Sequence, residues 1–216
     1  PDYVLVSESR LQPMVAALAR AAKRFYADPG RNDDYTAIIT RRHRQRLIAL
    51  RDEAENHGCR VIEIDASAEQ LEASGKLPPT LIVNPHRGLR IMQEEIFGPL
   101  LPVIGIRDFD AALAYIGRQP HPLALYAFTH DTQHHEKLLQ NTRSGGLVIN
   151  DTLWHVAQET LPFGGTGASG MGAYHGERGF VTFSHERSVL RQSRRSAVTL
   201  LNPPYRRWLL RLLRLI

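Results

Sequence analysis

Apolar side chains recur every three or four positions in two early segments of the chain, at 7–26 and 38–57. This spacing places them along one face of a helix and leaves the polar residues on the other. An Asp-Pro-Gly sequence at 28–30 ends the first segment, and Gly58 follows the second in a helix-ending position. We therefore predict two amphipathic helices, each with one face turned to a core.

Short apolar runs bounded by turn residues predict strands. They lie at 3–6, 61–64, 80–83, 100–106, 123–128 and 145–150. Two further helical segments, at 108–116 and 132–142, alternate with the later strands. Strands that alternate with helices of this length are typical of an α/β protein. The pattern therefore predicts an open, mostly parallel, twisted sheet with helices on both faces.

The length and composition are those of one globular domain. With 216 residues, 43% hydrophobic and 23% charged, the chain can bury a substantial core but is too short for two complete domains. The only cysteine, Cys59, excludes an internal disulfide and fits a reducing compartment. The sequence shows neither an export signal nor an apolar run of membrane-spanning length, from which we expect a cytoplasmic protein.

The net charge of +5 does not by itself indicate a nucleic-acid partner. Much of the excess positive charge lies near the C-terminus, and Arg41, Arg42, Arg44 and Arg46 fall on the second predicted helix. We interpret these arginines as a solvated helix face. We therefore predict no binding to nucleic acid.

A turn with distinctive chemistry precedes the apolar strand at 100–106. Glu94 and Glu95 stand beside Ile96 and Phe97, and a Gly-Pro pair closes the turn. Such a turn can present two carboxylates and an aromatic ring to a ligand at the edge of a site. A pair of glutamates in a loop is also common as a plain solvated turn, so the local chemistry leaves both interpretations open.

A second motif, Leu-Pro-Phe-Gly-Gly-Thr-Gly-Ala-Ser-Gly at 161–170, follows a strand that ends at Asn150. The two motifs together resemble the aldehyde dehydrogenase superfamily, which pairs an E-E-I-F-G-P turn with a P-F-G-G-x-x-x-S-G loop at a similar distance. The resemblance covers 1–191 and is closest to the class 3 type and its bacterial relatives, including coniferyl-aldehyde dehydrogenases. Further matching segments lie at 1–5, 145–151, 173–176 and 183–185.

The resemblance implies that residues 1–191 form most of the catalytic domain of an NAD- or NADP-dependent enzyme that oxidises an aromatic or aliphatic aldehyde. In that family a cysteine thiolate attacks the aldehyde, hydride passes to the nicotinamide, and a glutamate-activated water releases the acid. A small-molecule aldehyde is the substrate that the resemblance implies. It also implies a homo-oligomer.

The resemblance assigns roles to five residues of this chain. Glu95 would hold the hydroxyls of the nicotinamide ribose, and Phe97 would pack beside the nicotinamide. Phe163 would line the aldehyde tunnel, where an apolar aromatic wall suits a hydrophobic substrate. Asn150 and His155 would be neighbours of the substrate site.

The part of the family pattern that this chain matches does not include the nucleophile. The family places its cysteine in a G-Q-x-C-x-x-P stretch, and Pro1-Asp2-Tyr3 resembles the end of that stretch, so the nucleophile would lie three residues before Pro1. The glutamate base and the cofactor domain would lie upstream too. We therefore expect no catalytic residue in this chain, and a fragment that is inactive alone. Two alternatives stay open: a stand-alone interaction or oligomerisation module with the same fold, and an acylating or phosphate-reducing dehydrogenase.

Three local patterns suggest other chemistry, and we set them aside. The string at 165–170 matches a dinucleotide fingerprint, but it does not follow a strand, so its glycines are better explained by close backbone approach. His130, His134 and His135 have no cysteine or further ligand with them, so we predict no metal site. Cys59 has His57 nearby but no surrounding oxyanion-hole loop, so we favour a structural role.

The C-terminal extension, 192–216, contains a basic amphipathic segment at 205–216. Its leucines and Ile216 share one helical face, and Arg207, Arg211 and Arg214 share another. Twelve residues are too few to span a bilayer. Packing against protein and peripheral contact with a membrane are both open, and Trp208 with the arginine face supports the second.

Overall fold

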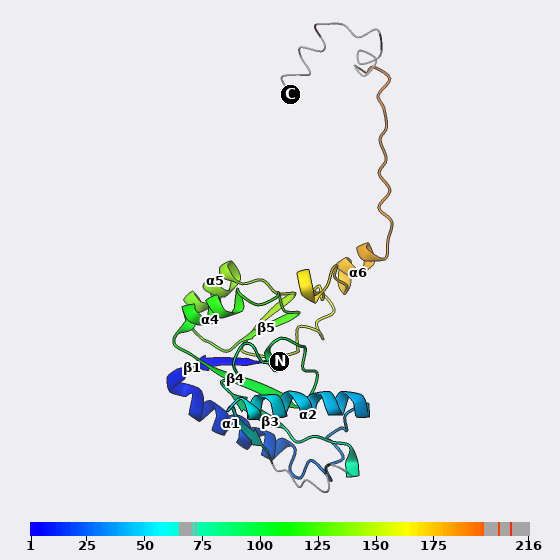
Figure 1. Ribbon diagram of the computed structural model, residues 1–216. Helices are drawn as coiled ribbons and strands as arrows, with labels where there is room; N and C mark the ends of the chain where they lie inside the picture. Colours follow the sequence, from blue (N-terminus) through cyan, green and yellow to red (C-terminus); the bar gives the residue numbers. More distant parts are fainter. Residues whose placement is uncertain (65–70, 72, 197–202, 204–207, 209–216) are drawn as a thin grey trace.

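The computed structural model of the chain describes residues 1–64, 71, 73–196, 203 and 208. The amphipathic segment predicted at 205–216 therefore lies outside the described residues, apart from Trp208. Strands and helices follow each other in the predicted order (Figure 1). The strands are β1 (Val4–Ser7), β2 (Arg60–Glu63), β3 (Thr80–Val83), β4 (Leu100–Ile106), β5 (Ala124–Ala127) and β6 (Gly146–Ile149). The α-helices are α1 (Leu11–Phe25), α2 (Arg41–Asn56), α4 (Phe109–Ile116), α5 (Thr132–Asn141) and α6 (Gly176–Thr182).

Four strands form a mixed sheet in the order β1-β4-β3-β2. β4 pairs in parallel with β1 on one side and with β3 on the other. β2 pairs with β3 in the antiparallel direction and forms one edge. The sheet is therefore mostly parallel, as the sequence predicts, with one antiparallel strand at its edge.

Helices cover both faces of this sheet. Successive side chains of a strand point to opposite faces, and β3 shows this directly. Ile82 belongs to the buried cluster that includes Leu47 and Leu50 of α2. Leu81, its neighbour in β3, belongs to the buried cluster that includes Leu11 of α1. This confirms the predicted α/β layering.

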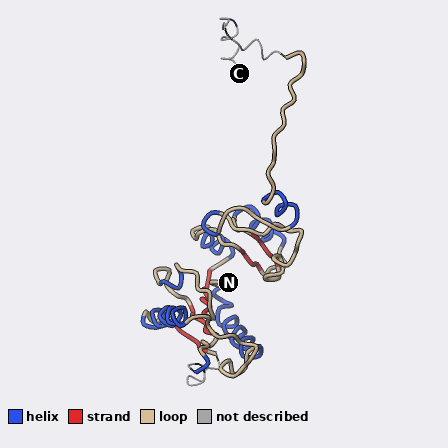
Figure 2. The backbone as a smooth tube through the Cα atoms, turned by 90° about the vertical axis from the view of Figure 1, so that its right-hand side faces the viewer, coloured by secondary structure: helices blue, strands red, loops and turns tan. Residues whose placement is uncertain are grey.

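β5 and β6 form a separate two-stranded parallel sheet, which Figure 2 shows apart from the other strands. Parallel neighbours require a crossover connection, and α5 supplies it between β5 and β6. α4 lies beside α5, where Lys137 Nζ and Asp110 Oδ1 are 2.6 Å apart. The sequence predicted one sheet, but the strands of the described residues divide between two.

Two predicted helix ends are observed, whereas α1 and α2 begin at Leu11 and Arg41, three or four residues after the predicted starts at 7 and 38. Asp108 caps α4 by accepting a hydrogen bond from the amide of Ala111 at 2.7 Å. Gly58 follows α2 with a φ of +78°, the left-handed conformation that glycine adopts without strain. At these two boundaries the capping residue correctly predicted where the helix begins or ends, which apolar periodicity alone does not define.

Candidate active site

The turn at 94–99 connects η2, a short 3-10 helix (Arg90–Met92), to β4. Ile96 is only 1% exposed and anchors the turn in the core beside α2. Its neighbours point the other way, since Phe97 is 76% exposed and Glu95 is exposed as well. The buried anchor thus presents a carboxylate and an aromatic ring together at the surface.

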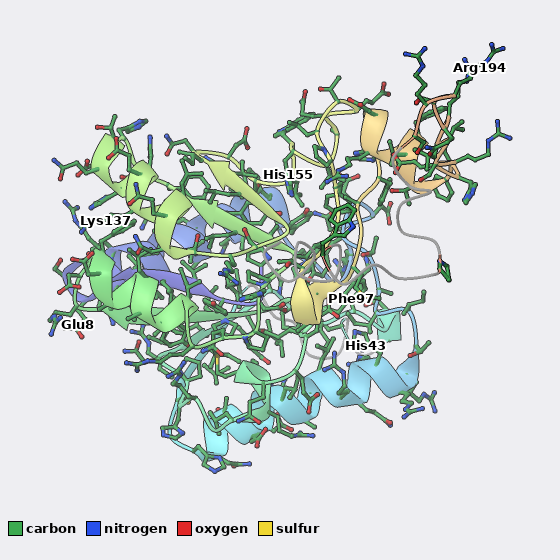
Figure 3. The ribbon with its side chains drawn as sticks, turned by 90° about the horizontal axis from the view of Figure 1, so that it is seen from above. Glu8, His43, Phe97, Lys137, His155 and Arg194 are labelled. Atoms are coloured by element: carbon green, nitrogen blue, oxygen red, sulfur yellow. The ribbon has the colours of Figure 1, made fainter. Side chains whose placement is uncertain are left out.

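Phe97 has a strained backbone. Its φ is +50°, in the left-handed region that a bulky residue rarely adopts, at a cost on the order of 1–3 kcal/mol. The carbonyl of Phe97 accepts a hydrogen bond from His43 Nε2 at 2.8 Å, and Figure 3 shows His43 beside Phe97. Strain that the surroundings hold in place is concentrated at functional sites, which makes this turn a candidate for one.

The start of the chain is attached to the same turn. Asp2 Oδ1 accepts a hydrogen bond from the amide of Ile96 at 3.0 Å, although the two residues lie far apart in the sequence. Tyr3 follows, and burial, with a smaller contribution from Tyr115, raises the pKa of its phenol. Tyr3 therefore stays neutral at physiological pH, so it adds no negative charge beside the Asp2 carboxylate.

Phe163 lies in a second group of residues, which we call the aromatic cluster: Tyr126, His155, Phe163, Tyr174 and His175. The ring of Phe163 meets His155 and Tyr174 edge-on, at centroid distances of 5.8 Å and 5.7 Å, and stacks on His175 at 6.0 Å. Phe163 and Tyr174 also exchange backbone hydrogen bonds of 2.9 Å and 3.0 Å. The loop that carries Phe163 is therefore fixed by its backbone as well as by ring packing.

His155 is packed against the β5–β6 sheet. A Cβ atom at Gly146 of β6 would lie 2.8 Å from His155 Cδ2, so a larger residue there would force the His155 ring to shift. The His155 ring is 6.0 Å from Tyr126 of β5. Both of its ring nitrogens are buried, and within the described part of the chain neither has a hydrogen-bond partner. A buried polar atom without a partner calls for an explanation, such as a ligand that supplies one.

Asn150 uses its side chain within the fold. Its Oδ1 accepts from the amide of Thr129 at 2.8 Å, and its Nδ2 donates to the carbonyl of Thr129 at 2.9 Å. The side chain is exposed at the carboxyl end of β6, the edge where ligands bind in sheets of this kind. The role of Asn150 as a neighbour of the substrate stays a prediction.

Sequence reasoning missed several residues of these two regions. Arg46, interpreted from the sequence as part of a solvated helix face, is bound to the turn: its Nη2 donates to the carbonyl of Ile96 at 2.6 Å. That interpretation is wrong for Arg46, because the turn at 94–99 packs on this part of the helix. Tyr174 and His175 lie in a segment that matches the family, but only their contacts with Phe163 indicate a place in the site.

The patterns set aside above have structural explanations. His134 stacks on Phe109 at 3.8 Å, and His135 Nε2 is 3.0 Å from the carbonyl of Thr129. A Cβ atom at Gly165 would lie 2.1 Å from the carbonyl oxygen of Ser169, which explains that glycine by close backbone approach.

Cys59 packs against the buried cluster beneath α2. Within the described residues, no three histidine, cysteine or acidic side chains form a group that could hold a metal ion. Among those same residues, no helix is long and apolar enough to cross a membrane.

Residues 1–189 match the model of the aldehyde dehydrogenase family. The chain therefore belongs to the aldehyde dehydrogenase family. A coniferyl aldehyde dehydrogenase of Pseudomonas sp. (strain HR199 / DSM 7063) is 49% identical over 195 residues, which cover 89% of this chain and 40% of that protein. A Mus musculus aldehyde dehydrogenase, described as dimeric and NADP-preferring, is 40% identical over 198 residues, which cover 91% of this chain and 42% of that protein.

The fold has a close counterpart among solved structures. The substrate-bound state of Staphylococcus aureus AldH superimposes with a TM-score of 0.81 at 38% identity, covering 100% of this chain and 46% of that one. The chain thus spans less than half the length of the proteins that it matches. These comparisons confirm the family that the two sequence motifs indicate.

Proposed function

We propose that this chain supplies the nicotinamide-facing turn and one wall of the substrate site in an NAD(P)-dependent aldehyde dehydrogenase. The observation that carries the proposal is the hydrogen bond between Asp2 and Ile96. The resemblance places the nucleophilic cysteine just upstream of Pro1. The bond would therefore hold the segment with the nucleophile next to the turn that carries Glu95 and Phe97.

The exposed face of the turn fits a nicotinamide nucleoside. Glu95 offers carboxylate oxygens, which accept charge-assisted hydrogen bonds from the two hydroxyls of a ribose. Phe97 offers a flat ring that is 76% exposed and can pack beside a flat nicotinamide. The cofactor, when bound, accepts the hydride of the aldehyde. The work of Glu95 and Phe97 is to fix the position and orientation of the nicotinamide riboside before that transfer.

The aromatic cluster suits an aldehyde with an apolar or aromatic body. Phe163 would form a wall of the tunnel, His155 would offer a polar ring atom beside it, and Asn150 would lie at the adjoining strand end. The relatives named for coniferyl aldehyde favour an aromatic substrate. We extend that preference to this chain as a proposal and include aliphatic aldehydes in the test.

The central experiment replaces Glu95 by Gln in the full-length enzyme that carries this chain. We expect weaker NAD(P)+ binding and slower hydride transfer, because an amide cannot match the charge-assisted bonds of a carboxylate. Glu136→Gln, an exposed change on α5, is the matched control. Cofactor affinity and turnover that both stay at the wild-type level in Glu95→Gln would contradict the proposed role of the turn.

A second experiment concerns the chain alone. Nucleophilic catalysis needs an activated thiolate and a base, which the resemblance places outside residues 1–216. We expect no NAD(P)H formation from the isolated chain with aromatic or aliphatic aldehydes. Turnover that disappears in Cys59→Ser would overturn both the expected absence of a nucleophile and the proposed assignment of roles.

We further propose that the full-length enzyme is a cytoplasmic homo-oligomer. The mouse relative described as dimeric supports the oligomer. The single cysteine of the chain supports a reducing compartment. Light scattering on the purified enzyme measures the mass directly, and a monomer at micromolar concentration would count against the oligomer.

The pattern at 205–216 supports contact with a membrane surface as an addition to this function. An apolar stripe, an arginine face and Trp208 are what an interfacial helix needs, and such a helix would suit an enzyme that handles lipophilic aldehydes. We expect the chain to co-sediment with anionic vesicles at low salt, and a chain that ends at 204 to remain in solution. Equal recovery of both with the vesicles would exclude the membrane contact.

A further inference from the structure

We propose that His43 and Arg46 of α2 form a clamp that fixes the backbone of the turn at 94–99 and so sets the positions of Glu95 and Phe97. We call these two side chains the α2 clamp. Their contacts are features of the structure, whereas their consequence for catalysis rests on the proposed function of the turn. Both are positioning residues, since neither is assigned a contact with cofactor or substrate.

Arg46 holds the turn on both sides of Glu95. Its Nη2 donates to the carbonyl of Ile96 at 2.6 Å, and its Nη1 donates to Glu94 Oε2 at 3.2 Å. The guanidinium is therefore shared between a backbone oxygen after Glu95 and a carboxylate before it. A planar group with several fixed donors suits this double task, which a single ammonium cannot perform in the same geometry.

His43 holds the strained residue. Its Nε2 lies 2.8 Å from the carbonyl oxygen of Phe97, and a carbonyl only accepts, so Nε2 must carry the hydrogen. In the neutral ring Nδ1 is then an acceptor, and it faces Arg46 Nη2 at 3.5 Å. The two members of the clamp thus support each other. The His43 ring also lies edge-on to the Phe97 ring, at a centroid distance of 6.4 Å.

The clamp is built on a well-fixed part of the molecule. His43 and Arg46 are three residues apart and therefore share one face of α2. Thr40 caps the helix by accepting from the amide of His43 at 3.1 Å. Leu47, the next residue after Arg46, is fully buried, and a Cβ atom at Gly98 would lie 2.5 Å from its Cδ1. Helix and turn are therefore in close contact on the buried side as well.

Three backbone groups of two consecutive residues are bound by separate side chains. Asp2 accepts from the Ile96 amide, Arg46 donates to the Ile96 carbonyl, and His43 donates to the Phe97 carbonyl. An exposed phenyl ring on a left-handed backbone contributes little burial to the fold. Polar contacts gathered around such a residue are therefore better explained by the geometry that they preserve than by stability.

The kinetic test uses the full-length enzyme with His43→Ala, His43→Gln and Arg46→Lys. Arg42→Lys, an exposed change on the same helix, is the control. For Arg46→Lys we expect the KM for NAD(P)+ to rise about ten-fold, which corresponds to one lost hydrogen bond from a charged donor. His43→Ala should also raise the cofactor KM. His43→Gln should raise it much less, because the glutamine amide can donate a hydrogen bond to the Phe97 carbonyl. The aldehyde KM and the thermal midpoint should stay near the control.

Hydrogen exchange on the same proteins without cofactor separates the clamp from the proposed function. We expect the double change His43→Ala with Arg46→Ala to increase deuterium uptake in peptides covering 93–99, with no increase over α4. Faster exchange with an unchanged cofactor KM would uphold the clamp and count against the roles of Glu95 and Phe97. Unchanged exchange at 93–99 would overturn the clamp, whatever the kinetics show.

Discussion

Asn150 closes the end of the β5–β6 sheet by binding both backbone groups of Thr129. The carboxamide accepts from the amide at 2.8 Å and donates to the carbonyl at 2.9 Å. Asn150 itself has a φ of +61°, a conformation that asparagine tolerates better than most residues. One side chain therefore ties the ends of two neighbouring strands, at the point where the chain enters the loop that carries His155 and Phe163 of the aromatic cluster.

The two hydrogen bonds between Asn150 and Thr129 give the first prediction. Asn150→Gly keeps the left-handed backbone but loses both hydrogen bonds, and we expect it to lower the free energy of unfolding by about 1 kcal/mol. Asn150→Ala adds backbone strain, and we expect it to lower the free energy of unfolding by about 2 kcal/mol. Urea unfolding measures both, with Asn56→Ala at the exposed end of α2 as the control. Equal values for the two changes at Asn150 would mean that its backbone carries no strain.

The second prediction concerns the cap of α4 and its dependence on pH. A hydrogen bond from the Ala111 amide, and a smaller effect of Arg107, lower the pKa of Asp108 below its ordinary value. A carboxyl with a lowered pKa in the folded state stabilises the fold at pH values above its unfolded pKa. That stabilisation is lost as the pH falls through the folded pKa.

We therefore expect Asp108→Ala to be less stable than the wild type at pH 7, with the difference shrinking below about pH 4. Unfolding in urea at both pH values provides the measurement. Asp108→Asn, which keeps a capping group without the charge, should lose less stability at pH 7 than Asp108→Ala. A difference between wild type and Asp108→Ala that is constant with pH would contradict the lowered pKa.

The sequence predicted those parts of the fold that depend on local pattern. α1 and α2 follow from apolar spacing, and Asp108 and Gly58 mark helix ends through their own chemistry. The division of the strands into two sheets was not predictable in this way. β4 and β5 are both short apolar runs, and nothing in either segment specifies whether they pair with each other.

The candidate site was predictable only in part, for a similar reason. Glu95, Phe97 and Phe163 lie in motifs that match the family, so a string of neighbouring residues identifies them. His43 and Arg46 lie on an arginine-rich helix about fifty positions away from the turn, and their pattern is that of any solvated face. Only the packing of α2 against the turn shows what they bind.

The third prediction tests the backbone contacts beneath Phe163. A Cβ atom at Gly164 would lie 2.1 Å from the carbonyl oxygen of Gly172, a clash that no side-chain rotation relieves. We expect Gly164→Ala to separate Phe163 from Tyr174 and to destabilise the chain by about 3 kcal/mol. Thermal unfolding measures the loss.

Gly117→Ala is the matched control for this change. The nearest atom to a Cβ there is a carbonyl oxygen at 3.4 Å, and the backbone is helical, so we expect a change within about 0.5 kcal/mol of zero. If Gly164→Ala were as mild as Gly117→Ala, the loop would have to shift without cost, and the close approach of its two backbone segments would not be required.

The last prediction concerns His155, whose two ring nitrogens are buried without a partner in the described part of the chain. An unpaired buried polar group is a cost to the fold, so an apolar ring of similar shape should be tolerated. We expect His155→Phe to leave the free energy of unfolding unchanged within about 1 kcal/mol or to raise it. In the full-length enzyme we expect the aldehyde KM to rise about five-fold with little change in kcat, because a hydrogen bond to bound substrate is lost. A marked loss of stability with an unchanged aldehyde KM would show that the nitrogens of His155 serve the fold and not the substrate.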